Sequence, residues 1–99
     1  MAKKLEDRPL SDDQKLVIKK IGEKVRKKRI EKGSTSYQTF AFENELSQAY
    51  FGEVERGKKD FSISYLVSVL SSLNVSLEDF FSGFKEPKKT KPPLSKRPK

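Results

Sequence analysis

Apolar residues in this chain recur at the three- and four-residue spacing of an α-helix, and this period restricts the fold more than any other feature. The clearest set stands at positions i, i+3, i+4 and i+7, which a helix places on one face: Leu66, Val69, Leu70 and Leu73. The serines and valines around them favour a strand by intrinsic propensity, but the period favours a helix. The segment therefore predicts an amphipathic helix whose apolar face belongs to the core, as do Phe80 and Phe81 further on.

Polar caps and glycines predict four more helices. Ser11 followed by Gln14 has the pattern of a capping box, and Gly33 is a natural end for the helix over 12–32 that this box opens. That helix is long for so small a domain, so its first turns either project from the domain or form a separate short helix. The other predicted helices cover residues 37–43, 48–56, 62 or 64 to 74, and 76–83, which makes the fold all-α.

The residue types that are missing exclude most kinds of catalysis. The 99 residues include no cysteine and no histidine, which excludes disulfide scaffolds, thiol nucleophiles, Cys/His zinc sites and histidine-based acid–base chemistry. We therefore expect no enzyme, no catalytic residue, no metal and no cofactor. No apolar run approaches the roughly 18 residues of a membrane span, and the acidic start lacks a signal peptide's apolar stretch, so we expect a cytoplasmic protein without a membrane partner.

The net charge of +8 is unevenly distributed. Residues 15–32 carry nine bases and two acids, residues 85–99 carry seven bases and one acid, and residues 33–84 are mildly acidic. The last 15 residues hold four of the five prolines, which predicts a disordered basic tail that either binds phosphates or only aids solubility. The expected organisation is a flexible N-terminus over 1–11, one domain over 12–84 and this tail.

The stretch from Ile21 to Phe81 resembles the helix-turn-helix domain of lambda-type phage repressors, Cro proteins and the wider XRE-like family of bacterial regulators. The most specific match is Glu55-Arg56-Gly57-Lys58, which corresponds to the family's E-R/N-G-K at the end of the recognition helix. Leu73-Asn74-Val75-Ser76 matches the family's L-G-V-S helix junction, and Lys27-Lys28-Arg29 with Gly33 matches the first helix. The resemblance implies a compact five-helix lambda-repressor-like domain with an N-terminal helical extension, and double-stranded DNA as partner.

The same resemblance implies roles for individual residues. Arg29 and Glu55 match a structural ion pair between the first and third helices, and Ala41 matches a small residue where the motif's two helices approach. Positions that face the major groove correspond to Ser47, Gln48, Ala49, Gly52 and Glu53, and phosphate-contacting positions correspond to Tyr37, Arg56 and Lys58. The side chains suit these roles, because Gln48 can bond adenine, Ala49 can pack on a thymine methyl and Glu53 can accept from cytosine.

The chain departs from the family at the turn between the second and third helices. Many members have an apolar residue followed by glycine there, whereas this chain has Asn44 and Glu45. We expect Asn44 to adopt the left-handed conformation, since asparagine tolerates it. We expect Phe42 to fill the core space that Asn44 leaves.

These features together predict a sequence-specific, repressor-like transcriptional regulator. The helix over 47–56 would read the major groove, while the lysines of the first helix and of the tail hold phosphates. A homodimer on a near-palindromic site follows from geometry, with Phe80, Phe81 and Phe84 as its candidate surface unless Phe84 folds back. The alternative is an antitoxin-like or protein-interaction module of the same fold with weak or lost DNA binding. The acidic middle segment favours that alternative, while a tail whose one apolar anchor is Leu94 disfavours a protein partner.

Overall fold

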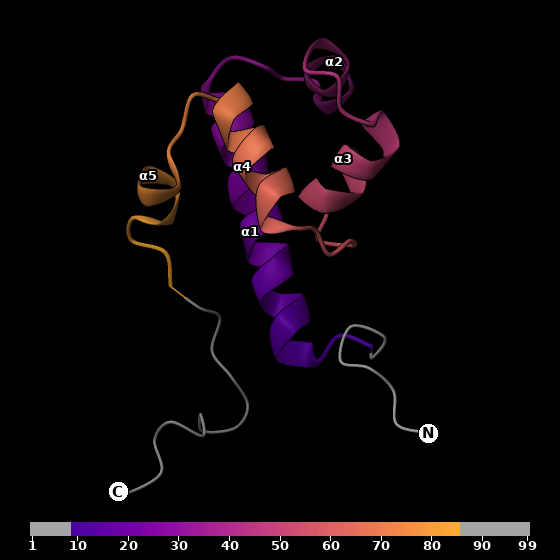
Figure 1. The fold of residues 1–99 in the computed structure, drawn as a ribbon, viewed down its shortest axis with the longest axis vertical. Helices are drawn as coiled ribbons and strands as arrows, with labels where there is room; N and C mark the ends of the chain where they lie inside the picture. Colours follow the sequence, from indigo (N-terminus) through magenta and orange to yellow (C-terminus); the bar gives the residue numbers. More distant parts are fainter. Residues whose placement is uncertain (1–8, 86–99) are drawn as a thin grey trace, which may run out of the picture.

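The structure, a computed structural model, describes residues 9–85, and this range contains α-helices joined by short loops and no strand (Figure 1). The helices are α1 (Asp12–Glu31), α2 (Tyr37–Glu43), α3 (Gln48–Glu55), α4 (Ile63–Ser72) and α5 (Leu77–Phe81). This confirms the predicted all-α, five-helix fold, and the helix ends differ from the predicted ones by two residues or fewer. The predicted basic tail and most of the flexible N-terminus lie outside the described residues. None of the helices in 9–85 is long and apolar enough to cross a membrane.

A serine begins every one of these helices. Each serine hydroxyl accepts a hydrogen bond from the backbone amide three residues ahead, which satisfies one of the free amides of the first turn. The five N-caps are Ser11, Ser36, Ser47, Ser62 and Ser76. At Ser11 the capping box is complete, since the Gln14 side chain also accepts from the Ser11 amide at 2.8 Å. The local sequence thus fixes where each helix starts.

Helix α1 is continuous over its 20 residues, so its first turns do not form a separate helix. It runs the length of the domain, with α2 and α3 on one side and α5 on the other (Figure 1). Gly22 allows α3 to approach closely, because a Cβ atom there would collide with the carbonyl oxygen of Val54. The close approach places the end of α3 against the middle of α1.

All five helices contribute to one core. It includes the aromatic pair Phe40 and Phe51, with ring centroids 5.2 Å apart, and the fully buried Phe80. The remaining buried members of this cluster are Val25, Ala41, Leu66, Val69, Leu70 and Leu73. The predicted apolar face of α4 is therefore confirmed as core, and Ala41, near the C-terminal end of α2, is fully buried.

The turn between α2 and α3 differs from expectation in two ways. The left-handed residue is Glu45, with φ of 59°, while Asn44 has φ of −109°. Asn44 instead uses its side-chain amide to donate to the Phe40 carbonyl at 2.8 Å, which satisfies an acceptor at the end of α2. Phe42 is 73% exposed and fills no core space, whereas Leu46 packs against the core after the turn.

Candidate nucleic-acid interface

Helix α3 has an inward side and an outward side with different chemistry. The inward side is buried and consists of Phe51, Gly52, Val54 and Glu55. On the outward side Ser47, Gln48 and Ala49 are exposed and Glu53 is half-buried. The helix therefore presents an amide, a methyl group and a carboxylate to solvent from a fixed support.

The outward side carries groups that match the edges of base pairs. The Gln48 amide can donate and accept at once, as recognition of adenine requires, and the Ala49 methyl can contact a thymine methyl. Ser47 is the N-cap, and its hydroxyl accepts from the Tyr50 amide at 3.2 Å. The Glu53 carboxylate lies 3.8 Å from the Lys59 ammonium, which reduces its repulsion of a nearby phosphate.

A buried ion pair holds the inward side in place. Arg29 on α1 donates to both carboxylate oxygens of Glu55, from Nε at 2.7 Å and from Nη2 at 2.9 Å. Its Nη1 donates to the Ser34 carbonyl at 2.7 Å, so that one guanidinium joins α1, α3 and the loop between α1 and α2. Arg29 is 3% exposed and Glu55 is 5% exposed. The geometry is that of a structural pair, since neither group can reach a ligand.

Gly52 and Tyr37 pack directly against each other. A Cβ atom on Gly52 would lie 2.6 Å from Cε1 of the Tyr37 ring and 3.0 Å from Cζ, closer than carbon atoms approach. Gly52 therefore faces Tyr37 rather than the solvent side where the resemblance placed it, and the missing side chain provides room for the ring. The contact fixes Tyr37, at the start of α2, beside the outward side of α3.

The segment after α3 brings basic residues to the C-terminal end of that helix. Arg56 and Lys58, both implied phosphate contacts, are exposed there. Gly57 has φ of 75°, and a Cβ on it would lie 2.7 Å from the Lys19 Cα, so the segment lies directly on α1. The Tyr50 hydroxyl donates to the Asp60 carbonyl at 2.7 Å and anchors the segment from the other side. Sequence reasoning did not single out Tyr50 and did not place Lys19 beside this segment, because their partners are distant along the chain.

Two tyrosines lie beneath this segment. The rings of Tyr50 and Tyr65 meet edge to face at 5.0 Å. The Tyr65 hydroxyl is buried and has no hydrogen-bond partner among the described residues. Burial raises the pKa of Tyr65 to about 12, and the nearby Tyr50 and Glu55 add to this rise. The pKa of Tyr50 is also raised, mainly by burial and further by the negative charge of Asp60.

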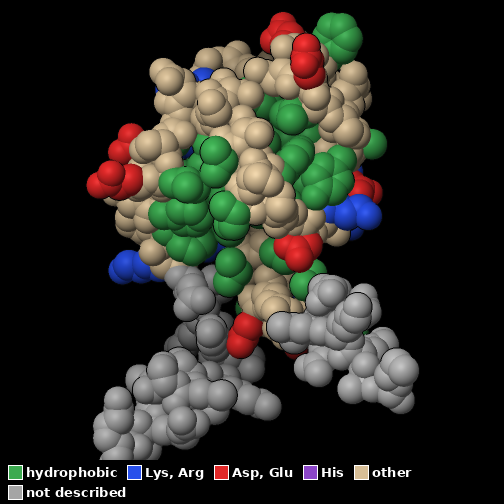
Figure 2. Space-filling view, viewed as in Figure 1, with side chains coloured by type: hydrophobic (Ala, Val, Ile, Leu, Met, Phe, Trp, Pro, Cys, Tyr) green, Lys and Arg blue, Asp and Glu red, His purple; other side chains and the backbone are tan. Residues whose placement is uncertain are grey.

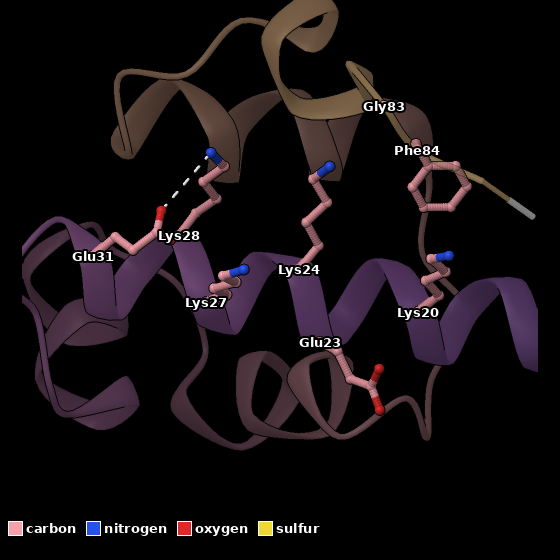
Figure 3. A pocket seen from close by; sticks show the side chains of 8 residues that line it. All are labelled: Lys20, Glu23, Lys24, Lys27, Lys28, Glu31, Gly83 and Phe84. Atoms are coloured by element: carbon pink, nitrogen blue, oxygen red, sulfur yellow. Dashed lines mark ion pairs between the residues drawn. The ribbon is translucent and has the colours of Figure 1, made fainter.

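The three phenylalanines at the C-terminal end of the domain do not form a free surface. Phe80 is fully buried, while Phe81 and Phe84 are half-buried. Phe84 folds back so that its ring meets Phe81 edge to face at 5.2 Å. The Lys20 and Lys24 ammonium groups lie 5.3 and 5.9 Å from the Phe84 ring centroid (Figure 3). Of the two placements considered for Phe84, the structure has the folded one.

The arrangement of α2, the tight turn and α3 defines a helix-turn-helix protein, because the second helix of the motif presents polar groups outward from a rigid core. No family model matches the chain. The chain is, however, similar to curated control proteins. The control protein C.MunI of a Mycoplasma species is 30% identical to it over 67 residues, which cover 68% of this chain and 90% of that protein. The control protein C.BamHI of Bacillus amyloliquefaciens is 33% identical over 59 residues, 60% of this chain and 73% of that protein.

Solved structures of gene regulators are also similar to this chain. The restriction-modification controller protein C.AhdI of Aeromonas hydrophila has a TM-score of 0.63 and 30% identity, covering 70% of this chain and 99% of that one. The clp gene regulator ClgR of C. glutamicum has a TM-score of 0.61 and 31% identity, covering 68% of this chain and 85% of that one. The chain therefore belongs to the XRE-like helix-turn-helix family of DNA-binding transcriptional regulators.

Proposed function

We propose that this chain controls transcription of the genes of a restriction-modification system by binding a near-palindromic operator as a homodimer. The resemblance to three control proteins supports this assignment, and C.AhdI is a restriction-modification controller by its description. The single observation that carries the proposal is the outward side of α3, where exposed polar groups stand on a helix whose other side is locked into the core.

In this proposal, the residues that contact bases are spread along the outward side of α3. Gln48 and Ala49 read the edges of an A·T pair, Glu53 accepts from a cytosine and Ser47 contacts the entry of the groove. Phosphates are held on either side of the groove by Tyr37, Arg56 and Lys58. Gly52 takes no part in base contact, because it supports Tyr37.

Dimerisation is assigned to α4 and α5 rather than to the phenylalanines. Figure 2 shows hydrophobic side chains gathered on the face where α4 and α5 lie, with few basic side chains among them. The exposed apolar residues of these helices are Ile63 at 67%, Val67 at 42% and Leu77 at 41%. Val67 and Leu77 line the same groove of about 540 Å³, whose lining also includes Ser71, Asn74, Ser76 and Asp79, so this groove offers a second copy both apolar and polar contacts. The proposed dimer requires a two-fold axis that sets the two α3 helices about 34 Å apart, one turn of DNA.

Selection from a random duplex library at about 150 mM salt tests the function, because this ionic strength suppresses binding that depends on phosphates alone. The proposal expects an inverted repeat with half-sites about one helical turn apart. It also expects that repeat in the source genome ahead of genes for a restriction endonuclease or its methyltransferase. Enrichment of a repeat found only near unrelated genes would refute the restriction-modification assignment, and no enrichment would refute operator binding.

Sedimentation of an apolar-to-basic variant tests the dimer. Val67→Lys combined with Leu77→Lys places two charges in the proposed interface, and we expect a monomer at tens of micromolar. Ile30→Lys is the matched control, since Ile30 is 41% exposed but lies on α1. A wild-type chain that sediments as a monomer with and without operator DNA would overturn the dimer.

A further inference from the structure

The basic residues of α1 lie on two flanks of the helix. Lys15 and Lys19 are one turn apart on one flank, and Lys20 and Lys24 are one turn apart on another. The second pair lies against the aromatic rings at the α5 end of the domain, with Lys24 also 5.5 Å from the Phe80 ring centroid (Figure 3). The two pairs carry the same charge in the same helix but face different parts of the molecule.

The first pair lies beside the segment that follows the recognition helix. A Cβ atom at Gly57 would lie 2.7, 2.9 and 3.0 Å from three carbon atoms of Lys19, so this segment rests on the first turns of α1. Lys58 and Lys59 follow directly in sequence. Residues far apart in the chain thus bring four lysines to one place, at the C-terminal end of α3.

These lysines border a groove of about 590 Å³ between the start of α1 and residues 57–59. Leu10, Leu16 and Ile18 also line it, and Asp12 is the one acid among its lining residues. All four lysines are exposed, and of these only Lys59 forms an ion pair among the described residues, with Glu53 at 3.8 Å. Apolar stems can therefore lie on the leucines while the ammonium groups stay in water.

We propose that this groove, bordered by Lys15, Lys19, Lys58 and Lys59, is a phosphate-binding surface that extends the DNA contact beyond α3. The inference rests on the proposed function, since it continues the same duplex past the recognition helix. Lys15 and Lys19 have Cβ atoms about 6 Å apart along the helix, and phosphates of one DNA strand follow one another at about 3.4 Å of axial rise. Each lysine can therefore reach a different phosphate of one strand.

The other lysine pair of α1 faces away from α3 and from this groove. Lys20 and Lys24 lie on the α5 side of α1, whereas α3 lies on the other side (Figures 1 and 3). The structure thus assigns different roles to two lysine pairs that composition alone treats as equal. It also supplies a matched control, because neutralising either pair removes the same charge from the same helix.

The first experiment measures the salt dependence of binding to a mixed-sequence duplex and to the selected operator. Lys15→Gln with Lys19→Gln should reduce the log–log slope of affinity against salt by about 2 for each bound protomer, and so by about 4 for the homodimer on its operator, since each lost phosphate contact removes roughly 0.9. Affinity near 0.1 M salt should fall roughly tenfold or more. Lys20→Gln with Lys24→Gln should leave the slope within a few tenths of wild type. Equal losses in the two variants, or none in the first, would overturn the proposal.

A second experiment does not depend on affinity. The chain contains no cysteine, so Lys15→Cys can carry a single DNA-cleaving chelate, with Lys24→Cys as the control. We expect cleavage from position 15 at the outer flank of each half-site and none from position 24. Cleavage from both positions or from position 24 alone would contradict the assignment. An operator that is selected and bound while position 15 cleaves nothing would refute this surface and leave the proposed function intact, whereas failure to select any operator would refute the function itself.

Discussion

The two sides of α3 differ in how firmly their residues are held. The inward side contains two fully or nearly fully buried apolar residues, Phe51 and Val54, and a carboxylate that accepts two hydrogen bonds from Arg29. On the outward side, Gln48 and Ala49 are exposed, and the Gln48 side chain forms no hydrogen bond to the other residues that the structure describes. One helix of eight residues therefore combines a side that fixes its position with a side that is free for recognition.

This difference implies that stability and DNA specificity can be changed separately. A change on the inward side should weaken folding, and binding only as a consequence. A change on the outward side should alter binding while leaving folding intact. Surface substitutions away from caps and buried groups usually change the free energy of unfolding by less than about 0.5 kcal/mol. A change on the outward side should therefore stay below that value, and a change on the inward side should exceed it.

The largest effect should come from breaking the buried ion pair. Arg29→Ala leaves the Glu55 carboxylate buried without its partner and the Ser34 carbonyl without its donor, so we expect a loss of about 3–5 kcal/mol in the free energy of unfolding. Denaturant unfolding measures it, and Arg26→Ala, at an exposed position on the same helix, is the control. Equal stability of the two variants would show that the pair contributes nothing.

The second-largest effect should appear in DNA affinity and not in stability. Gln48→Ala should weaken binding to the selected operator by about 1–3 kcal/mol for each half-site and leave the mixed-sequence affinity nearly unchanged, because it removes one bidentate base contact from each protomer. Gln38→Ala provides the control, since Gln38 is an exposed glutamine on α2. A loss of thermal stability in Gln48→Ala would show that the outward side also supports the fold. Unchanged operator affinity would contradict the assigned base contact.

Gly52 tests the boundary between the two sides. Alanine is favoured over glycine in a helix by about 1 kcal/mol, but here its Cβ would displace the Tyr37 ring. We expect Gly52→Ala to gain that stability only in a Tyr37→Ala background, and to weaken DNA binding when Tyr37 is present. A double-mutant cycle of unfolding free energies measures the coupling. Additive effects would mean that the ring moves away without cost.

The smallest effect at neutral pH should come from Tyr65→Phe. The hydroxyl is buried without a partner, so its removal should change stability by less than about 1 kcal/mol. The pH dependence is more informative: Tyr65 has a pKa of about 12 in the folded chain against the ordinary value of 10, so the unfolded state ionises first. Stability should therefore fall as the pH rises from 10 towards 12, and Tyr65→Phe should lose part of that fall. Identical alkaline unfolding curves would refute this.

The helix starts were predictable because their signals are local. Every helix begins at a serine whose hydroxyl caps an amide three residues away, and such a pattern is visible in a short stretch of sequence. The apolar period of α4 was equally local. The resemblance pointed to Arg29 and Glu55, 26 residues apart, which spacing alone could not have paired.

What the sequence could not show depended on contacts between distant segments. Asn44 was the natural candidate for the left-handed position, yet its side-chain amide donates to the Phe40 carbonyl from a residue with φ of −109°, and the next residue, Glu45, has the left-handed conformation. Gly52 has no local reason to be a glycine, because the reason is the Tyr37 ring. The basic groove at Lys19 and Gly57 likewise exists only through the packing of α1 against the segment after α3.

The most direct test of the central claim, that the outward side of α3 selects the DNA sequence, is library selection performed in parallel with the wild type and Gln48→Ala. The account predicts an inverted repeat with the same half-site spacing in both selections, with the preference relaxed at one symmetric pair of positions in the variant. Identical sequence preferences from the two proteins would contradict it, since specificity would then come from somewhere other than the outward side of α3.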